Sequence, residues 1–199
     1  MSDLRFLIDG AANNRIRQVV LIRAGVALLY AHWEGFVKAV AQLYLEFVAM
    51  QRCRNADLAD NILAIALRSK FSVAQGAKKI GAHRTIVEFF RLHMEKRSKL
   101  PKNNIISTES NLSSAVLIEI LSTLGLPTTD YEAKFRLIDN QLVAKRNHIA
   151  HGNVLTVDSE EYMELHEEIS GLMTLFRNQV ENAAVTRDYL LNPAATGPP

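Results

Sequence analysis

Residues 145–152, with the sequence KRNHIAHG, bring together side chains suited to act on a phosphodiester. Arg146 keeps its charge at any working pH, and a guanidinium grips phosphate oxygens through a fixed fork of donors. His148 and His151 can give or take a proton near neutral pH. Cleavage of a phosphodiester needs both properties, because charge builds on the phosphorus oxygens while protons move between the reacting hydroxyls. The neutral amide of Asn147 can orient either a phosphate or a histidine.

The spacing of these residues limits how they can work together. On a straight α-helix, Arg146 and His151 are five residues apart and point about 140° away from each other. His148 and His151 are three apart and share a face. Convergence therefore requires that the helix ends near Ala150, which Gly152 would allow, or that a second subunit supplies the missing group across a two-fold axis.

Two other interpretations of the same residues stay open. In a structural one, Lys145 and Arg146 are surface residues, and the two histidines are cations that the dipole favours at a helix C-terminus. In the other, His148 and His151 bind zinc. The zinc interpretation offers two ligands where a protein site normally needs three or four, and no other Cys or His cluster completes the set.

All the long apolar patterns in the chain have helical spacing, so the predicted fold class is an all-α bundle. The longest pattern begins at Asn13 or Asn14, ends near Arg52, and carries few charges, which predicts a central helix packed on several sides. The residues between Asn153 and Val157 are the longest run with a strand-like pattern. The other predicted helices cover 56–70, 73–94 with a break near Gly81, 111 or 113 to 124, 129–151 and 158–190.

Several of these helices have sequence signals at their ends. Asn55 is placed to cap the second helix, and Gly125 followed by Pro127 indicates a C-terminal stop. Thr129 and Glu132 have the spacing of a capping box. The last helix begins after Asp158 with acidic residues in its first turn, where the helix dipole stabilises them.

The composition predicts a single domain over residues 1–190 with a disordered tail at 191–199. Hydrophobic residues make up 48% of the 199, enough for a substantial core. Cys53 is the one cysteine, which fits a reducing cytoplasm. The first residues lack a secretory pattern, and the uncharged apolar run from Ala24 to Trp33 is about half of what a membrane span needs. We therefore expect a soluble cytoplasmic protein without a membrane partner.

The net charge of +2 hides an uneven distribution along the chain. Residues 1–102 hold 17 Lys and Arg against 8 Asp and Glu, whereas residues 103–199 hold 6 against 13. Such a split is typical either of a basic surface that attracts a polyanion or of solvated helix faces. Candidate contacts for an RNA backbone are the cations of one polar loop, together with the lysine of the motif: Lys96, Arg97, Lys99, Lys102 and Lys145.

Glu34 is an acid within an otherwise apolar stretch of the first long helix. A lone buried charge is costly, so the carboxylate either faces water or pairs with a cation. Arg146 or one of the histidines is the partner that we expect, which would give Glu34 a supporting role in the site.

The chain resembles the HEPN superfamily, whose signature is an arginine followed after four to six residues by a histidine. Arg146 and His151 match that signature, with a polar residue after the arginine. Two further stretches are similar to the MAE-type branch of HEPN-like nucleases, near the RiboL-PSP group. One is AHWEGFVK at 31–38, and the other is TESNL at 108–112 leading into IEIL and LGL at 118–126. The resemblance covers about residues 13–185.

The resemblance implies a HEPN-like helical bundle, a homodimer with a composite active site, and RNA cleavage without a metal or other cofactor. It implies Arg146 and His151 as catalytic residues, and makes Asn147 and His148 candidates beside them. Such proteins commonly act in bacterial conflict, as toxins or antiviral effectors, beside an antitoxin or a neighbouring defence protein. Some HEPN domains are instead non-catalytic modules that bind a nucleotide or a partner protein. In that alternative for this chain, the arginine and histidine hold the ligand, and the acidic helix 158–168 is a docking surface.

Overall fold

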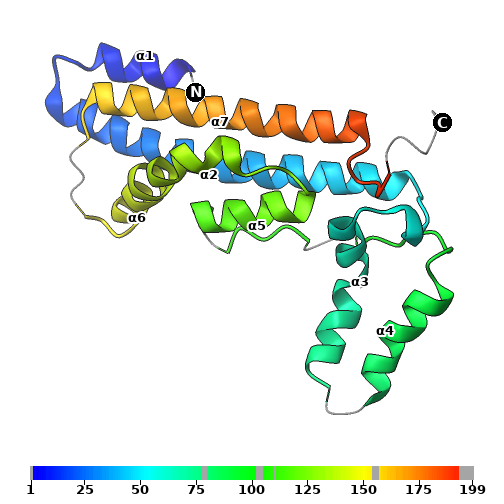
Figure 1. Ribbon diagram of the computed structural model, residues 1–199. Coiled ribbons are helices and arrows are strands. Elements are labelled where there is room, and N and C mark those ends of the chain that lie inside the picture. The colour runs from blue at the N-terminus through cyan, green and yellow to red at the C-terminus, as the bar shows by residue number, and fades with distance from the viewer. Residues whose placement is uncertain (1, 78–79, 102–104, 110, 154–156, 193–199) are drawn as a thin grey trace. The chain divides into compact units, whose positions relative to one another are not determined.

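The computed structural model describes residues 2–77, 80–101, 105–109, 111–153 and 157–192, and within them the fold is all-α (Figure 1). The described residues contain isolated β-bridges at Arg54–Arg97 and Leu58–Leu190 but no β-strand. The predicted fold class is therefore confirmed. The α-helices are α1 (Ser2–Gly10), α2 (Arg15–Met50), α3 (Asp60–Gln75), α4 (Ile80–Leu92), α5 (Ser114–Leu124), α6 (Ala144–Ala150) and α7 (Ser159–Thr186). Three shorter segments are the 3-10 helices η1 (Asn55–Asp57) and η2 (Thr129–Lys134) and the π-helix η3 (Leu137–Val143).

Helix α2 is the long helix that the sequence predicts. Asn14 caps it, because its side-chain oxygen accepts a hydrogen bond from the Arg17 amide at 3.0 Å. By length and composition alone α2 could cross a membrane, but core helices of soluble proteins pass the same test. In its most apolar 18-residue window, 33% of the residues are buried. Much of this apolar helix is therefore exposed on the described chain.

The chain divides into two compact units. Unit 1 comprises residues 1–39, 108–119 and 128–178, and unit 2 comprises residues 40–107, 120–127 and 179–199. Helices α2, α5 and α7 contribute residues to both units. Folding as a single domain over residues 1–190 stays a prediction.

The core of unit 1 is a cluster of apolar side chains from both ends of the sequence. Ile8, Ile22, Val26, Val157 and Tyr162 are buried together, and Ile149 of α6 packs against them. Helix α7 begins as predicted, since the Asp158 carboxylate accepts a hydrogen bond from the Glu161 amide at 2.9 Å. Val157 before this cap and Tyr162 four positions after it lie in the same cluster, which is the arrangement of a hydrophobic staple.

Unit 2 is tied together by its C-terminal segment. The Tyr189 carbonyl accepts a hydrogen bond from the Ala59 amide, and the Leu191 amide donates to the Asp57 carbonyl, both at 2.9 Å. The Tyr189 ring also meets Phe47 edge to face, with centroids 6.0 Å apart. Leu191 and Asn192 of the predicted tail are thus described, whereas residues 193–199 lie outside the described residues.

Several predicted helix boundaries are wrong. No side chain caps α3, whose N-cap is Ala59. Asn55 lies in η1 instead, and its side-chain nitrogen donates to the His93 carbonyl at 2.8 Å. Helix α3 continues to Gln75, so the predicted boundary between 70 and 73 is absent, whereas the break before α4 at Ile80 lies close to Gly81 as predicted. Residues 129–134 form a 3-10 helix without a side-chain cap, so the predicted capping box is absent. Helix α1 lies outside the helices predicted from the sequence.

Candidate functional site

Helix α6 carries the motif and ends where Gly152 predicts. Gly152 has φ +74°, a conformation that glycine adopts without strain. Its amide donates to the Ile149 carbonyl at 3.1 Å, and the Asn153 amide donates to the His148 carbonyl at 3.0 Å. This pair of bonds is a Schellman motif. His151 is therefore the last residue of the turn, placed between the helix and the left-handed glycine.

Arg146 is half-buried and held from two sides. Its Nη1 donates to the side-chain oxygens of Asn111 and Asn147, both at 2.8 Å. Its guanidinium carbon lies 4.4 Å from the centroid of the Tyr30 ring, within range of a cation–π contact. A guanidinium has five N–H donors, and the described residues provide acceptors for the two on Nη1. Nε and Nη2 are therefore left to bind a ligand.

Tyr30 connects Arg146 to Leu112, in the segment before α5, and to Glu34 of α2. Its ring is buried, and its hydroxyl oxygen accepts a hydrogen bond from the Leu112 amide at 2.8 Å. Burial raises the pKa of the Tyr30 hydroxyl, the Leu112 bond lowers it, and the charge and hydrogen bonding of Glu34 raise it further. The hydroxyl therefore stays protonated, and Tyr30 serves as a fixed platform beneath the guanidinium.

Glu34 differs from the expectation. It is half-buried, but the described residues give it no ion pair with Arg146 or with a histidine. Its carboxylate acts on the Tyr30 hydroxyl instead, one helical turn away on α2. Tyr30 thus interacts with both charged groups.

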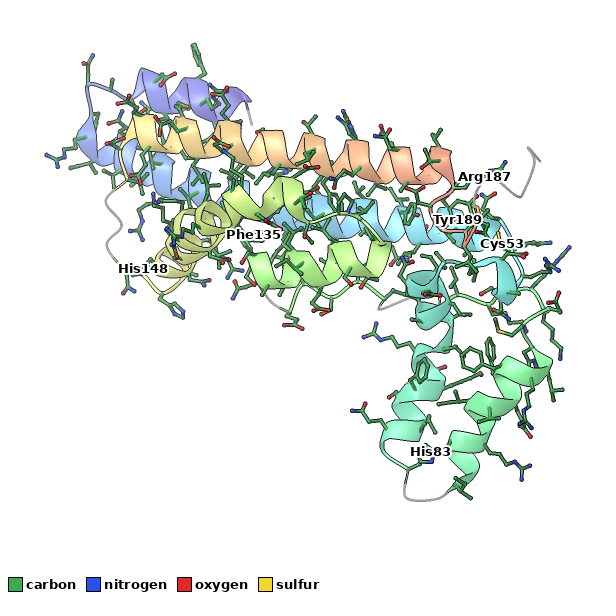
Figure 2. All side chains as sticks on the ribbon, viewed as in Figure 1. Cys53, His83, Phe135, His148, Arg187 and Tyr189 are labelled. Atoms are coloured by element: carbon green, nitrogen blue, oxygen red, sulfur yellow. The ribbon has the colours of Figure 1, made fainter. Side chains whose placement is uncertain are left out.

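The two histidines lie on the exposed side of α6. His148 and His151 are both exposed, and Figure 2 shows His148 on the outer side of the helix. The described residues offer neither histidine a side-chain hydrogen bond or ion pair. Arg146 lies beside the Tyr30 ring. Helix α6 ends at Ala150, which is the condition under which Arg146 and His151 could converge within one chain, and the divergence between them stays a prediction. Within one chain, the structure brings Arg146 together with Asn147, Tyr30 and Asn111, but not with a histidine.

The remaining predicted RNA contacts have different surroundings. Lys145 forms an ion pair with Glu161 and its side chain is 12% exposed, so its charge is already used, contrary to the expected RNA-binding role. Lys96, Arg97 and Lys99 are exposed in unit 2. Lys102 lies outside the described residues. Unit 1 therefore holds Arg146, and unit 2 holds the described part of the cationic loop.

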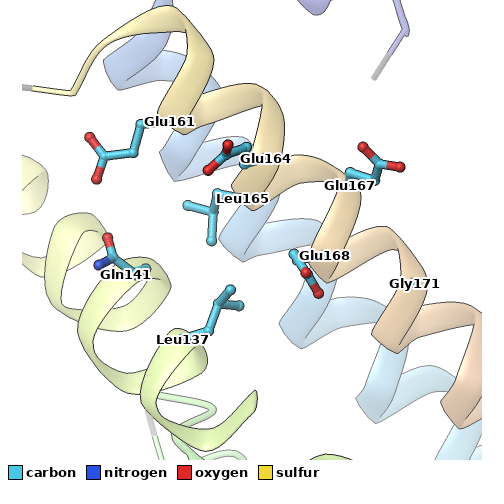
Figure 3. A pocket seen from close by; sticks show the side chains of 8 residues that line it. All are labelled: Leu137, Gln141, Glu161, Glu164, Leu165, Glu167, Glu168 and Gly171. Atoms are coloured by element: carbon cyan, nitrogen blue, oxygen red, sulfur yellow. The ribbon is translucent and has the colours of Figure 1, made fainter. Parts of the chain in front are cut away.

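A cavity of about 830 Å³ lies between η3 and α7 in unit 1 (Figure 3). Four carboxylates line it, from Glu161, Glu164, Glu167 and Glu168, together with the apolar Leu137 and Leu165. Lys145 and Lys134 pair with two of these acids, Glu161 and Glu168. The remaining negative charge repels a phosphate backbone, so this cavity is unsuited to RNA. In the part of the chain that the structure describes, no group of three or more His, Cys, Asp or Glu residues could hold a metal ion.

Tyr30 and Asn111 are site residues that were not predicted from the sequence. Tyr30 is four residues before Glu34, so the two share a helix face, and this spacing was the available signal. Asn111 follows α4 and precedes α5 in the chain. Nothing in its local sequence indicates that it will meet a residue 35 positions later.

An all-α chain with an arginine and, after four intervening residues, a histidine at the end of a short helix has the architecture of a HEPN domain. The family model described as RiboL-PSP-HEPN matches residues 1–182, and the chain belongs to that family. No curated protein and no solved structure matches the chain significantly. Family membership identifies a HEPN module, which is nuclease-like or RNA-related.

Proposed function

We propose that the protein is a metal-independent endoribonuclease of the HEPN type. The observation that carries this proposal is the arrangement at Arg146, where Tyr30, Asn111 and Asn147 fix a guanidinium that keeps donors for a phosphate. A preorganised charge of this kind stabilises a transition state without reorganisation at the moment of reaction. His151, exposed at the end of the same helix, supplies the proton transfer that the reaction also needs.

The proposed reaction uses the RNA 2′-hydroxyl as an internal nucleophile. One histidine removes the 2′ proton as the bond from the 2′ oxygen to phosphorus forms. A second histidine gives a proton to the 5′ oxygen as its bond to phosphorus breaks. Arg146 neutralises the negative charge that builds on the phosphorus oxygens. The products are a 2′,3′-cyclic phosphate and a 5′-hydroxyl, and DNA resists because it lacks the attacking group.

The second proton-transfer group comes, in this proposal, from a second copy of the chain. One exposed stripe of α2 fits such a contact, and we call it the α2 stripe: Ile16, Val20, Ala24, Leu28, Ala31 and Gly35. At 100° per residue its members fall within an arc of about 120°. Glu34 lies at the edge of the same arc, so a copy packed on the stripe would lie beside the Arg146 site. An isologous contact brings the same patch from both chains together.

The test is RNA cleavage by the purified protein in EDTA. His151→Ala should lower the rate by about 10²–10⁴-fold, the usual contribution of a positioned acid or base. Arg146→Ala should lower it by about 10²–10³-fold. His83→Ala and Arg136→Ala alter exposed residues outside the site and should retain the wild-type rate. The cleaved ends should carry a cyclic phosphate, and a matching DNA strand should remain intact. Full activity of the His151 variant, or a requirement for added metal, would refute the chemistry.

The second candidate function is a non-catalytic module that binds a nucleotide or a partner protein. The acidic cavity between η3 and α7 favours it, because Glu164 and Glu167, which remain beside the lysine-paired Glu161 and Glu168, suit a basic protein segment. Absence of cleavage on every RNA tested, with retained nucleotide or protein binding, would support this function over the first. The biological setting that we propose, a bacterial toxin or antiviral effector with an antitoxin or neighbouring defence protein, rests on the family alone.

A further inference from the structure

Unit 2 contains a pocket of about 370 Å³ that combines two cations with two hydroxyl groups. Arg68, Ser69 and Ser72 line it from α3, and Lys99 lines it from the loop that follows α4. The buried side chains of Ile65 and Ile105 form its apolar wall. We call it the Arg68–Lys99 pocket.

The helical spacing of its α3 residues makes the pocket a single surface. Ile65, Ser69 and Ser72 are four and three residues apart, so they share one face of α3. The Arg68 guanidinium is fixed at this surface, because its Nη1 donates to the Ile105 carbonyl at 3.1 Å. Guanidinium, ammonium and hydroxyl groups are all hydrogen-bond donors, and together they match the oxygens of a phosphate. No acidic residue lines the pocket among those that the structure describes.

The net charges of the two units also favour a phosphate-bearing ligand for unit 2. Unit 1, which contains Arg146, holds 10 Lys and Arg against 14 Asp and Glu, a net charge of −4. Unit 2 holds 13 against 7, a net charge of +6. Affinity for a nucleic acid depends strongly on cations that contact its phosphates. The negative unit that carries the reactive arginine is thus poorly suited to hold a long polyanion by charge, and the positive unit is well suited.

We propose that the Arg68–Lys99 pocket binds a backbone phosphate of the RNA strand. This contact uses none of the residues of the Arg146 site. The inference rests on the proposed function for the identity of the polyanion. It gives Lys99 a specific role that it does not give to Lys96 or Arg97, which lie in the same loop but outside the pocket. Phosphate contacts fix position and carry no base sequence, so the pocket should bind strands of any sequence.

The first experiment measures binding of the full chain to a labelled 2′-O-methyl RNA of about fifteen nucleotides, a probe that cannot be cleaved through its 2′ position. The Arg68→Gln/Lys99→Gln variant should bind at least about 10-fold more weakly at low salt. Loss of two phosphate contacts should also reduce the slope of log affinity against log salt by about 1.4, at about 0.7 for each contact on a single strand. The matched control, Arg52→Gln/Arg91→Gln, removes two exposed cations of unit 2 outside the pocket and should change both quantities much less.

A second variant separates a built pocket from diffuse attraction. Ser69→Ala/Ser72→Ala leaves the net charge unchanged, and alanine is a good helix former, so α3 should persist. Loss of two hydroxyl donors should weaken binding by about 5- to 30-fold with an unaltered salt slope. Diffuse attraction predicts no change at all. Thermal unfolding followed by circular dichroism checks that each variant is folded.

The outcomes distinguish this inference from the proposed function. Cleavage of ordinary RNA is measured in parallel, so an inactive protein whose binding still depends on the pocket would sink the nuclease proposal and leave the pocket standing. The wild type could instead cleave RNA while the pocket variant and the control variant bind the probe equally well. That result would overturn the proposed phosphate-binding role of the pocket. Inorganic phosphate and adenosine monophosphate are tested as competitors. Competition at concentrations as low as those of the strand would assign the pocket to a free nucleotide or phosphate and overturn the inference.

Discussion

Arg146 is set apart from an ordinary surface arginine by what holds it. Asn111 and Asn147 accept from one nitrogen, and the Tyr30 ring covers one face of the guanidinium. A charge held in one geometry loses little entropy when a phosphate binds, since its rotamer is already chosen. Asn111 acts through Arg146 and is therefore a positioning residue.

Replacement of Asn111 by alanine should lower RNA cleavage by about 10- to 100-fold, because small displacements of a catalytic group have effects of this size. Asn111→Asp keeps a side-chain acceptor for Nη1 and should recover much of the rate. Asn140→Ala, a change at an exposed asparagine of η3, is the control. Rates under single-turnover conditions and thermal unfolding decide the result. Equal loss in the aspartate and alanine variants would show that Asn111 does not act through its oxygen.

His166 of α7 should make the protein less stable in mild acid. It is 8% exposed, and neither of its nitrogens has a hydrogen-bond partner among the described residues. Burial lowers the pKa of His166 below its ordinary value of 6.5, and the charge of Arg5 lowers it further. Below that value the unfolded chain binds a proton that the folded chain does not, so the free energy of unfolding falls as pH decreases.

The measurement is urea unfolding between pH 7.5 and pH 5. The wild type should lose stability on acidification, and His166→Gln, which cannot titrate, should lose less. His32→Gln, at an exposed histidine of α2, should behave like the wild type. An identical pH dependence in the wild type and the His166 variant would contradict this prediction.

At the scale of the element, α2 contains two glycines with opposite surroundings. A Cβ atom added at Gly25 would lie 2.8 Å from the buried ring of Tyr162, whereas one added at Gly35 would meet nothing within 4 Å. Gly25 thus lets α2 and α7 approach closely inside unit 1, and Gly35 leaves a smooth exposed surface.

Gly25→Ala should destabilise the protein by about 1–3 kcal/mol, since overpacking in a core outweighs the better helix propensity of alanine. Gly35→Ala, measured on the monomer, should stabilise the chain by about 0.5–1 kcal/mol, because alanine loses less backbone entropy in a helix and finds open space. Free energies of unfolding in denaturant compare the two. Equal effects of the two changes would mean that Tyr162 leaves room for a Cβ atom at position 25.

At the scale of the whole molecule, the α2 stripe is the feature that a single chain leaves unexplained. From Ile16 to Gly35 it spans about 29 Å at 1.5 Å per residue, enough for a substantial helical contact. Its small residues, Ala24, Ala31 and Gly35, allow a second helix to approach closely. Covering this apolar surface is the driving force that we propose for dimerisation.

Gly35→Arg should turn the dimer into a monomer and lower RNA cleavage with it, because a charged side chain would separate the two facing helices. The monomer itself should fold normally, since the position has open space. Light scattering after size exclusion gives the mass, and the cleavage assay gives the activity. Phe6→Arg, at a residue of α1 that is 78% exposed, is the control. A wild type that is both monomeric and active would contradict the composite site.

The sequence by itself determined the helical class, the long central helix, and the caps at Asp158 and Gly152. These depend on local spacing and on the conformational preferences of single residues, which act over one or two turns. Tertiary structure decided the rest. The 3-10 and π segments before α6, the platform of Tyr30, the contact between Asn111 and Arg146 and the pairing of Lys145 with Glu161 all depend on residues far apart in the sequence. Packing of distant elements outweighs local propensity at such positions. The local sequence does not indicate which side chains this packing brings into contact.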